Sequence, residues 1–254
     1  MKRVPVRLYL HQLRTEQLVF WRNRESAFFI FAFPVMLFLL LGSLYGDDRT
    51  DEGYAGTAVL LAGMLGYGAA NTGFAGLAIT LVVRREYGIL KRIRSTPLPA
   101  ATYFAAALTS TLLVFALQAL VLFGLGRLLY DTELPGRPLS LAFLVVFGAA
   151  AFAGIGIGTS ALIRSAEGSS AVVNFILLPM AFLSGSFGGR DYPRVLEAIA
   201  DVLPLKYFID LLRDVYLEQE SPWSNPGSLA VVAAWGLGGL VLAFRRFGWE
   251  PRER

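Results

Sequence analysis

Six stretches of the chain contain no Asp, Glu, Lys, Arg or His, and each is long enough to cross a membrane as a helix. About 20 residues, rising about 1.5 Å each, cross a hydrocarbon core about 30 Å thick. Lipid offers the backbone no hydrogen bonds, so a spanning segment must be a helix or part of a closed barrel. The stretches are continuously apolar rather than alternating, which excludes a barrel. The charge-free stretches are 26–46, 53–83, 95–126, 138–163, 168–189 and 221–244.

This pattern predicts an all-α membrane protein with a single transmembrane domain over residues 1–254. Neither an internal repeat nor a second domain is evident in the sequence. The six predicted spans cover about 27–45, 55–83, 101–125, 139–163, 170–187 and 228–244.

The segment before the first span, residues 1–25, has the pattern of an amphipathic helix. On a helical wheel one face carries apolar and aromatic side chains, interrupted by Gln17, while arginines keep the rest polar. We expect this helix to lie on the inner membrane surface; an ordinary basic tail is the alternative. The residues of the apolar face are Val6, Leu10, Leu13, Phe20 and Trp21.

The longest segment between spans, 190–220, predicts two short helices instead of a plain loop. Apolar residues recur at helical spacing after Pro193, and Pro204 separates them from a second amphipathic stretch. Neither helix is long enough to span. We therefore expect a re-entrant or interfacial hairpin at the outer leaflet.

The distribution of charge fixes the expected orientation. With both termini inside, the segments between spans hold 16 Lys and Arg on the inner side and 7 on the outer side. The positive-inside rule then orients the chain with both termini cytoplasmic, and the plasma membrane is the expected location. The net charge of +4 reflects this topology and contact with lipid, and no nucleic-acid motif competes with that interpretation.

Small residues recur within two of the predicted spans. The span at 55–83 carries Gly63, Gly66 and Gly73, and the span at 139–163 carries Gly154 and Gly158. Small residues let helices approach closely in lipid, where no hydrophobic force drives association. From the sequence alone they serve equally well to pack one chain or to form a dimer face.

The residue inventory excludes most catalytic chemistry. The chain has one histidine, His11, and no cysteine, which excludes zinc and Cys–His sites and leaves no candidate metal or catalytic residue. It has no P-loop, so we expect no cofactor bound by this chain. The predicted spans contain no ionisable side chain, whereas ion-coupled carriers place such groups at membrane depth. Energy for transport would then come from a partner.

The segment between the second and third spans is predicted to be a short, basic helix at the inner surface. Apolar residues alternate there with Lys91, Arg92 and Arg94, and Pro97 and Pro99 end it. It suits either force transmission from a soluble partner or simple anchoring by positive charge, and composition alone does not separate these roles.

Two motifs resemble those of ABC-2 type permeases. Residues 86–98, EYGILKRIRSTPL, are similar to the family's E-x-G-x-L segment that ends in proline. Pro204-Leu-Lys-Tyr207 followed by Arg213 resembles the family's signature after the fifth span, as does Leu183-Ser184-Gly185. The order and spacing match over essentially the whole chain.

The resemblance implies a fold, partners and roles for individual residues. Family members pair two six-span subunits with two cytoplasmic ATPase subunits, which bind ATP and Mg²⁺. Residues 84–97 are similar to the coupling helix that contacts the ATPase, and 190–217 to the outer re-entrant helices. By this resemblance the ATPase-coupling residues are Glu86, Gly88, Lys91, Arg92, Arg94 and Pro97. The outer-gate residues are Ser184, Gly185, Pro204, Tyr207 and Arg213.

The expected function is therefore that of a transmembrane subunit of an ATP-driven exporter. The few polar side chains in the spans, Asn71, Thr72 and Asn174, mark the expected substrate pathway, and the apolar surroundings suit a hydrophobic or amphipathic cargo such as a drug, antibiotic or lipid. A stand-alone secondary transporter or channel and a non-transporting membrane scaffold are the alternatives.

Overall fold

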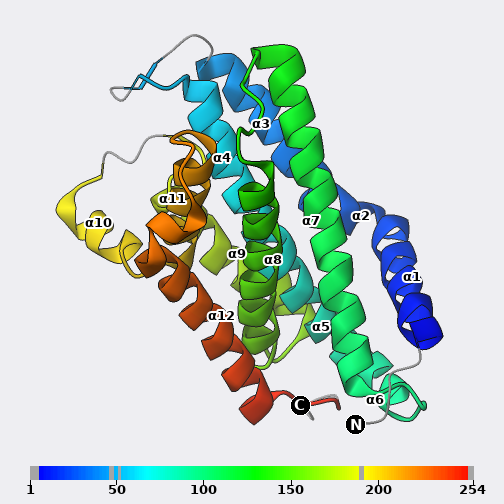
Figure 1. Cartoon of the computed structure of the whole chain (residues 1–254). Coiled ribbons are helices and arrows are strands. Elements are labelled where there is room, and N and C mark those ends of the chain that lie inside the picture. Colours follow the sequence, from blue (N-terminus) through cyan, green and yellow to red (C-terminus); the bar gives the residue numbers. More distant parts are fainter. Residues whose placement is uncertain (1–5, 46–48, 51–52, 189–191, 251–254) are drawn as a thin grey trace.

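The computed structural model describes residues 6–45, 49–50, 53–188 and 192–250. Within them, six helices are long and apolar enough to cross a membrane, as predicted. The two termini and the short helix α6 lie at one end of the bundle (Figure 1). Residues 1–5 of the predicted N-terminal segment, the outer loop residues 46–48 and 51–52, and the tail 251–254 lie outside the described residues.

The spans agree with the charge-free runs to within a few residues at each end. The six are Arg24–Tyr45, Gly56–Glu86, Ala100–Tyr130, Pro138–Ser160, Ala166–Leu183 and Pro226–Arg246. Two of them are composite helices, in which a π-helical segment joins α-helical parts. The first comprises α2 (Arg24–Ala27), η1 (Phe28–Ala32) and α3 (Phe33–Tyr45). The second comprises α4 (Gly56–Ala69), η2 (Ala70–Gly76) and α5 (Leu77–Glu86).

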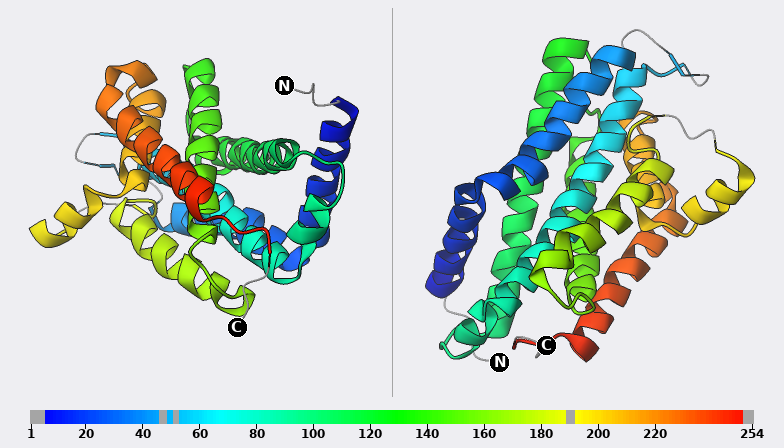
Figure 2. Two further views of the ribbon diagram at one scale, coloured as in Figure 1. Left: turned by 90° about the horizontal axis from the view of Figure 1, so that it is seen from below. Right: turned by 180° about the vertical axis from the view of Figure 1, so that it is seen from behind.

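The remaining helices include four single spans and four shorter elements around them. The spans are α7 (Ala100–Tyr130), α8 (Pro138–Ser160), α9 (Ala166–Leu183) and α12 (Pro226–Arg246). The longer non-spanning helix, α1 (Val6–Arg22), runs beside α7 (Figure 2). The shorter ones are α6 (Ile89–Arg94), α10 (Arg194–Ala200) and α11 (Pro204–Tyr216), with a 3₁₀ turn, η3 (Pro222–Ser224), before α12.

Glycines bring the second, fourth and sixth spans into backbone contact. A Cβ added at Gly154 or Gly158 of α8 would come within 2.5 Å of a backbone oxygen of Gly236 or Gly239 in α12. A Cβ at Gly156 would meet the backbone of η2 at 2.6 Å. These small residues therefore pack helices within one chain, which answers the question that the sequence left open.

The fifth span ends earlier than expected, at Leu183 instead of residue 187. Gly185 adopts φ +76°, and the amides of Gly185 and Ser186 bond back to the carbonyls of Phe182 and Ala181 at 3.1 and 3.0 Å. This is a Schellman C-cap, in which a glycine in the left-handed region terminates the helix. The Ser-Gly-Ser sequence thus stops α9 instead of extending the span.

The predicted pair of short helices in 190–220 is present as α10 and α11, but the two have different surroundings. α11 packs among α4, α8 and α12, and its apolar side chains are buried; α10 stands away from the bundle, with Val195, Ile199 and Val202 exposed (Figures 1 and 2). A Cβ at Gly148 of α8 would come within 2.6 Å of a ring carbon of Phe208, so glycine in α8 makes room for α11. Residues 189–191 of this segment lie outside the described residues.

Candidate functional site: the coupling segment and its anchors

The predicted coupling segment leaves the second span at a sharp corner. The helix ends at Glu86, and Gly88 adopts φ +69° before α6 begins at Ile89. A Cβ at Gly88 would touch nothing within 4 Å, so glycine is needed here for its backbone angle alone. The positive φ turns the chain away from the span and starts a separate helix.

The short helix α6 presents its positive charges outward. Leu90 is buried and holds the helix to the bundle, while Lys91, Arg92 and Arg94 are exposed, as is Pro97 beyond it. Lys91 lies 3.8 Å from the carboxylate of Glu250 in a solvent-exposed pair that contributes little to stability. The exposed basic residues are therefore available to a partner at this end of the molecule.

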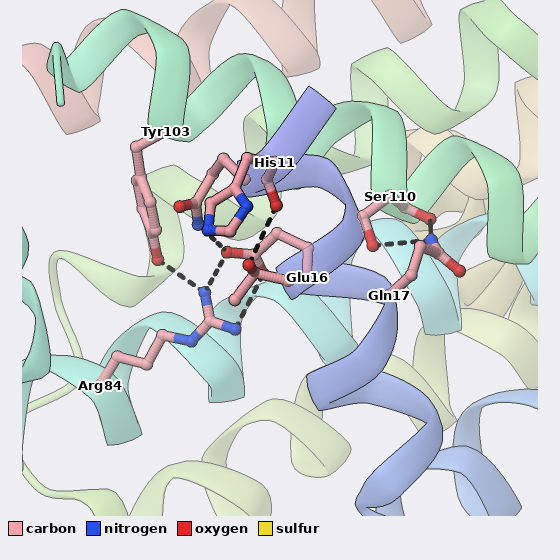
Figure 3. A network of polar contacts seen from close by, with 8 residues as sticks. His11, Glu16, Gln17, Arg84, Tyr103 and Ser110 are labelled. Atoms are coloured by element: carbon pink, nitrogen blue, oxygen red, sulfur yellow. Dashed lines mark hydrogen bonds and ion pairs between the residues drawn. The ribbon is translucent and has the colours of Figure 1, made fainter. Parts of the chain in front are cut away.

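Three consecutive charged residues anchor the base of this segment; the sequence placed all three outside the second span, whereas the helix continues through them to Glu86. Arg84 is the first. Its guanidinium donates two hydrogen bonds, at 2.9 and 2.8 Å, to the carboxylate of Glu16 in α1, and a third at 2.9 Å to the hydroxyl of Tyr103 in α7 (Figure 3). The side chains of Arg84 and Glu16 are only 11% and 8% exposed. The pair joins the end of the second span to both α1 and α7.

Arg85, the second of these residues, is almost fully buried. Its guanidinium donates to the carbonyl of Ser160 at 2.8 Å and also to the carbonyl of Ile163. These carbonyls belong to the end of α8 and the turn after it, where the helix leaves acceptors unsatisfied and carries partial negative charge. Arg85 thus caps the C-terminal end of the fourth span.

Glu86, the third residue, binds the start of the next helix, α9, whereas Arg85 binds the end of α8. Its carboxylate accepts a hydrogen bond from the amide of Ala166, the first residue of α9. The N-terminus of a helix carries free N–H groups and partial positive charge, which a carboxylate stabilises. Arg85 and Glu86 together hold the connection between the fourth and fifth spans to the base of the coupling segment.

The N-terminal helix contacts the bundle partly through polar side chains. Gln17 donates to the carbonyl and hydroxyl of Ser110 in α7 at 3.1 and 2.9 Å, while Val6, Leu10 and Trp21 are exposed. Gln17, which interrupts the apolar face on the wheel, therefore contacts protein. Sequence reasoning missed Glu16 as a functional residue, although it is the only acidic residue before residue 25.

The three predicted pathway residues line two adjoining cavities that share seven residues. One, of about 560 Å³, has Asn71 and Asn174 on its walls; the other, of about 400 Å³, has Thr72. Asn71 is already engaged: its amide donates to the carbonyls of Phe29 and Ile30 at 2.9 and 3.4 Å. The imino nitrogen of Pro34 has no hydrogen for these carbonyls, so Asn71 satisfies the backbone of the first span.

Two elements that carry predicted outer-gate residues, the turn after α9 and the helix α11, pack against glycines of α4. A Cβ at Gly63 would lie 2.5 Å from the carbonyl oxygen of Ser186 and 2.9 Å from that of Gly185. One turn along α4, Gly66 faces Leu205 and Ile209 of α11, the helix that Pro204 begins. Ser184 is buried, and Arg213 is partly buried on α11.

Tyr207, the remaining gate residue, ties α11 to the turn before it. Its hydroxyl donates to the carbonyl of Asp201 at 2.7 Å. The larger cavity lies between the first, second and fifth spans. The smaller one is also lined by α1 and α7.

Comparison with known proteins identifies the family. A family model described as "ABC-2 type transporter" matches residues 8–217. Two relatives, from Escherichia coli strain K12 and Escherichia coli O157:H7, each carry the name "Probable multidrug ABC transporter permease YbhR". Each is 24% identical over 166 residues, which is 64% of this chain and 45% of the relative, so the match spans less than half of their length. The family match covers most of the chain, including the N-terminal helix, the coupling segment and α11, and the chain therefore belongs to the ABC-2 type transporter family.

Proposed function

We propose that this permease is the membrane-spanning subunit of an ATP-driven exporter, whose separate cytoplasmic ATPase docks on α6. The observation that carries the proposal is the run Arg84-Arg85-Glu86. It connects an exposed basic helix to α1, to α7, to the end of α8 and to the start of α9. A force applied to α6 would reach four helices through buried polar contacts instead of being lost in a flexible loop.

The surroundings of the cavities support an amphipathic cargo. Their walls combine apolar side chains with polar ones such as Asn174, Ser170 and Glu25. Such a lining accepts a largely apolar molecule and fixes its orientation through a small number of polar contacts. The "multidrug" label of the Escherichia coli relatives is consistent with cargo of this kind.

We further propose that two six-span subunits assemble, with both termini cytoplasmic. One side of the fifth span lacks internal cover: Phe175 is 81% exposed and Phe182 58%. An apolar face of this kind suits a second subunit or lipid. Exposed Arg92 and Arg94, on the same end as the termini, agree with the expected cytoplasmic orientation.

The test is reconstitution in liposomes with the cognate ATPase. Arg92→Ala should weaken ATPase binding, because Arg92 is exposed on α6. Glu86→Gln should leave binding intact but lower transport per ATP hydrolysed, because Glu86 contacts α9 inside the permease. Arg137→Ala, exposed at the opposite end, is the matched control.

Two outcomes would contradict the proposal. If both Arg92→Ala and Glu86→Gln retain ATPase binding and transport, α6 is not the coupling element. If the purified permease moves solute down an ion gradient without any ATPase, it is a secondary transporter. A partner that binds without ATP-dependent movement of cargo would instead identify a scaffold.

A further inference from the structure

An apolar groove lies between the start of α7 and the end of α12, apart from the cavities and the coupling contacts. Its volume is about 410 Å³. Every lining side chain is aliphatic or aromatic, and the indole N–H of Trp249 is the one side-chain hydrogen-bond donor among them, so the groove favours an apolar occupant. The lining residues are Ala100, Ala101, Phe104, Leu108, Ile157, Leu240, Ala243, Phe244, Phe247 and Trp249.

The groove runs along the spans from one end of the bundle toward its middle. It extends from Ala100 to Leu108 on α7, which is about 12 Å of helix at about 1.5 Å per residue. Aromatic rings form the end of the groove at the start of α7. There the ring centroid of Phe104 lies 5.5 Å from that of Phe247 and 5.7 Å from that of Trp249. Tryptophan favours the level of the lipid headgroups, and the groove therefore starts at the interface and enters the hydrocarbon region.

Positively charged groups lie close to the end of the groove at the start of α7. Arg245 and Arg246 are both exposed and lie between two lining residues, Phe244 and Phe247. α7 also begins here without a side-chain cap, so its first amides and its positive dipole end are open to an anion. The carboxylate of Glu250 is at this end too, but it lies 3.8 Å from Lys91.

We propose that this groove binds an anionic glycerophospholipid from the leaflet at this end. An acyl chain fills the apolar groove, and the phosphate lies against Arg245, Arg246 and the N-terminus of α7. Apolar walls below a cationic rim match the two halves of such a lipid. Basic sites of this kind between transmembrane helices recognise acidic headgroups. A zwitterionic lipid gains less from this charge, because its headgroup cation is repelled by the arginines that attract its phosphate, and a neutral cargo gains nothing from it.

The test measures the lipid that stays with the full-length protein. The protein is reconstituted in equal phosphatidylglycerol and phosphatidylcholine, re-extracted in mild detergent, and its retained lipids are counted by mass spectrometry. The variants are R245Q/R246Q, which removes the charge, and Ala101→Trp, which fills the groove from an exposed position. The controls are R137Q, which removes one positive charge, and Leu117→Trp, which introduces a tryptophan; both positions are exposed and lie outside the groove.

Wild-type protein is expected to retain phosphatidylglycerol in preference to phosphatidylcholine. R245Q/R246Q should reduce that preference by up to about 30-fold, roughly fivefold for each charge. Ala101→Trp should reduce the number of retained lipids, and neither control should change it. Equal retention of the two lipids by wild type, or a wild-type count in Ala101→Trp, would overturn the proposal. So would a change in oligomeric mass in Ala101→Trp with unchanged lipid, which would show that a second copy fills the groove.

Discussion

The ion pair between Glu16 and Arg84 should stabilise the docking of α1 far more than a surface pair would. Its two hydrogen bonds are 2.8 and 2.9 Å long, and both side chains are about nine-tenths buried. Removing one partner of such a pair leaves the other charge buried without compensation, at a cost of about 3–5 kcal/mol. Because some exposure remains, we expect the lower end of that range for either Glu16→Leu or Arg84→Leu.

A double-mutant cycle separates this interaction from other effects of the two substitutions. If each single change costs about 3 kcal/mol, the double variant should also cost about 3 instead of 6, a coupling of about 3 kcal/mol, because no lone charge remains. The assay is reversible unfolding in mixed micelles with increasing dodecyl sulfate. The exposed pair Arg127–Asp131, 2.6 Å apart within α7 and the turn after it, is the control and should show less than about 0.5 kcal/mol. A similarly small coupling for Glu16 and Arg84 would refute the reasoning.

Three further predictions concern packing, hydrogen bonding and pH. Asn71→Leu should lower the free energy of unfolding by about 1–3 kcal/mol in the same assay, because it strands the carbonyls of Phe29 and Ile30; an unchanged value would show that those carbonyls find other donors. Gly63→Ala should cost about 1–3 kcal/mol, since its methyl group would meet backbone at 2.5 Å, whereas Gly124→Ala, with nothing within 4 Å, should be harmless; equal effects would contradict the packing argument. Burial raises the pKa of Asp214, and Asp210 and Glu220 add to this, while Asn225 and Arg213 oppose it. A raised folded pKa means that the folded state binds more protons, so this contribution to stability falls as pH rises from about 3.8 through the folded value. The melting temperature of D214N should therefore be higher than that of wild type at pH 7 and equal to it below about pH 3.8. A difference in melting temperature that grows on acidification would contradict this pH dependence.

The sequence predicts the membrane spans well because the absence of charge is a local property. It misplaces the ends of the spans where a backbone angle, or a partner far away in the sequence, determines the residue at which the helix stops. Gly185 ends α9 through a left-handed turn, and the second span continues to Glu86 because Arg84 and Arg85 find partners elsewhere in the fold.

In the candidate site, too, local features could be predicted from the sequence and contacts between distant residues could not. The exposed basic residues of α6 follow from composition and from resemblance. The role of Arg85 could not be predicted, because its acceptors are backbone carbonyls 75 and 78 positions along the chain. Asn71 was predicted as a polar residue of the pathway, and its bond to the first span depends on where Pro34 interrupts that helix.

The burial of α11 has a consequence for biosynthesis. This helix has 13 residues, too few to cross the bilayer, and its apolar side chains are covered by α4, α8 and α12. The helix that completes this cover, α12, follows α11 in the chain and emerges from the ribosome after it. α11 can therefore pack on α4 and α8 as soon as it is synthesised, but the face that α12 covers stays open until the last span has been inserted.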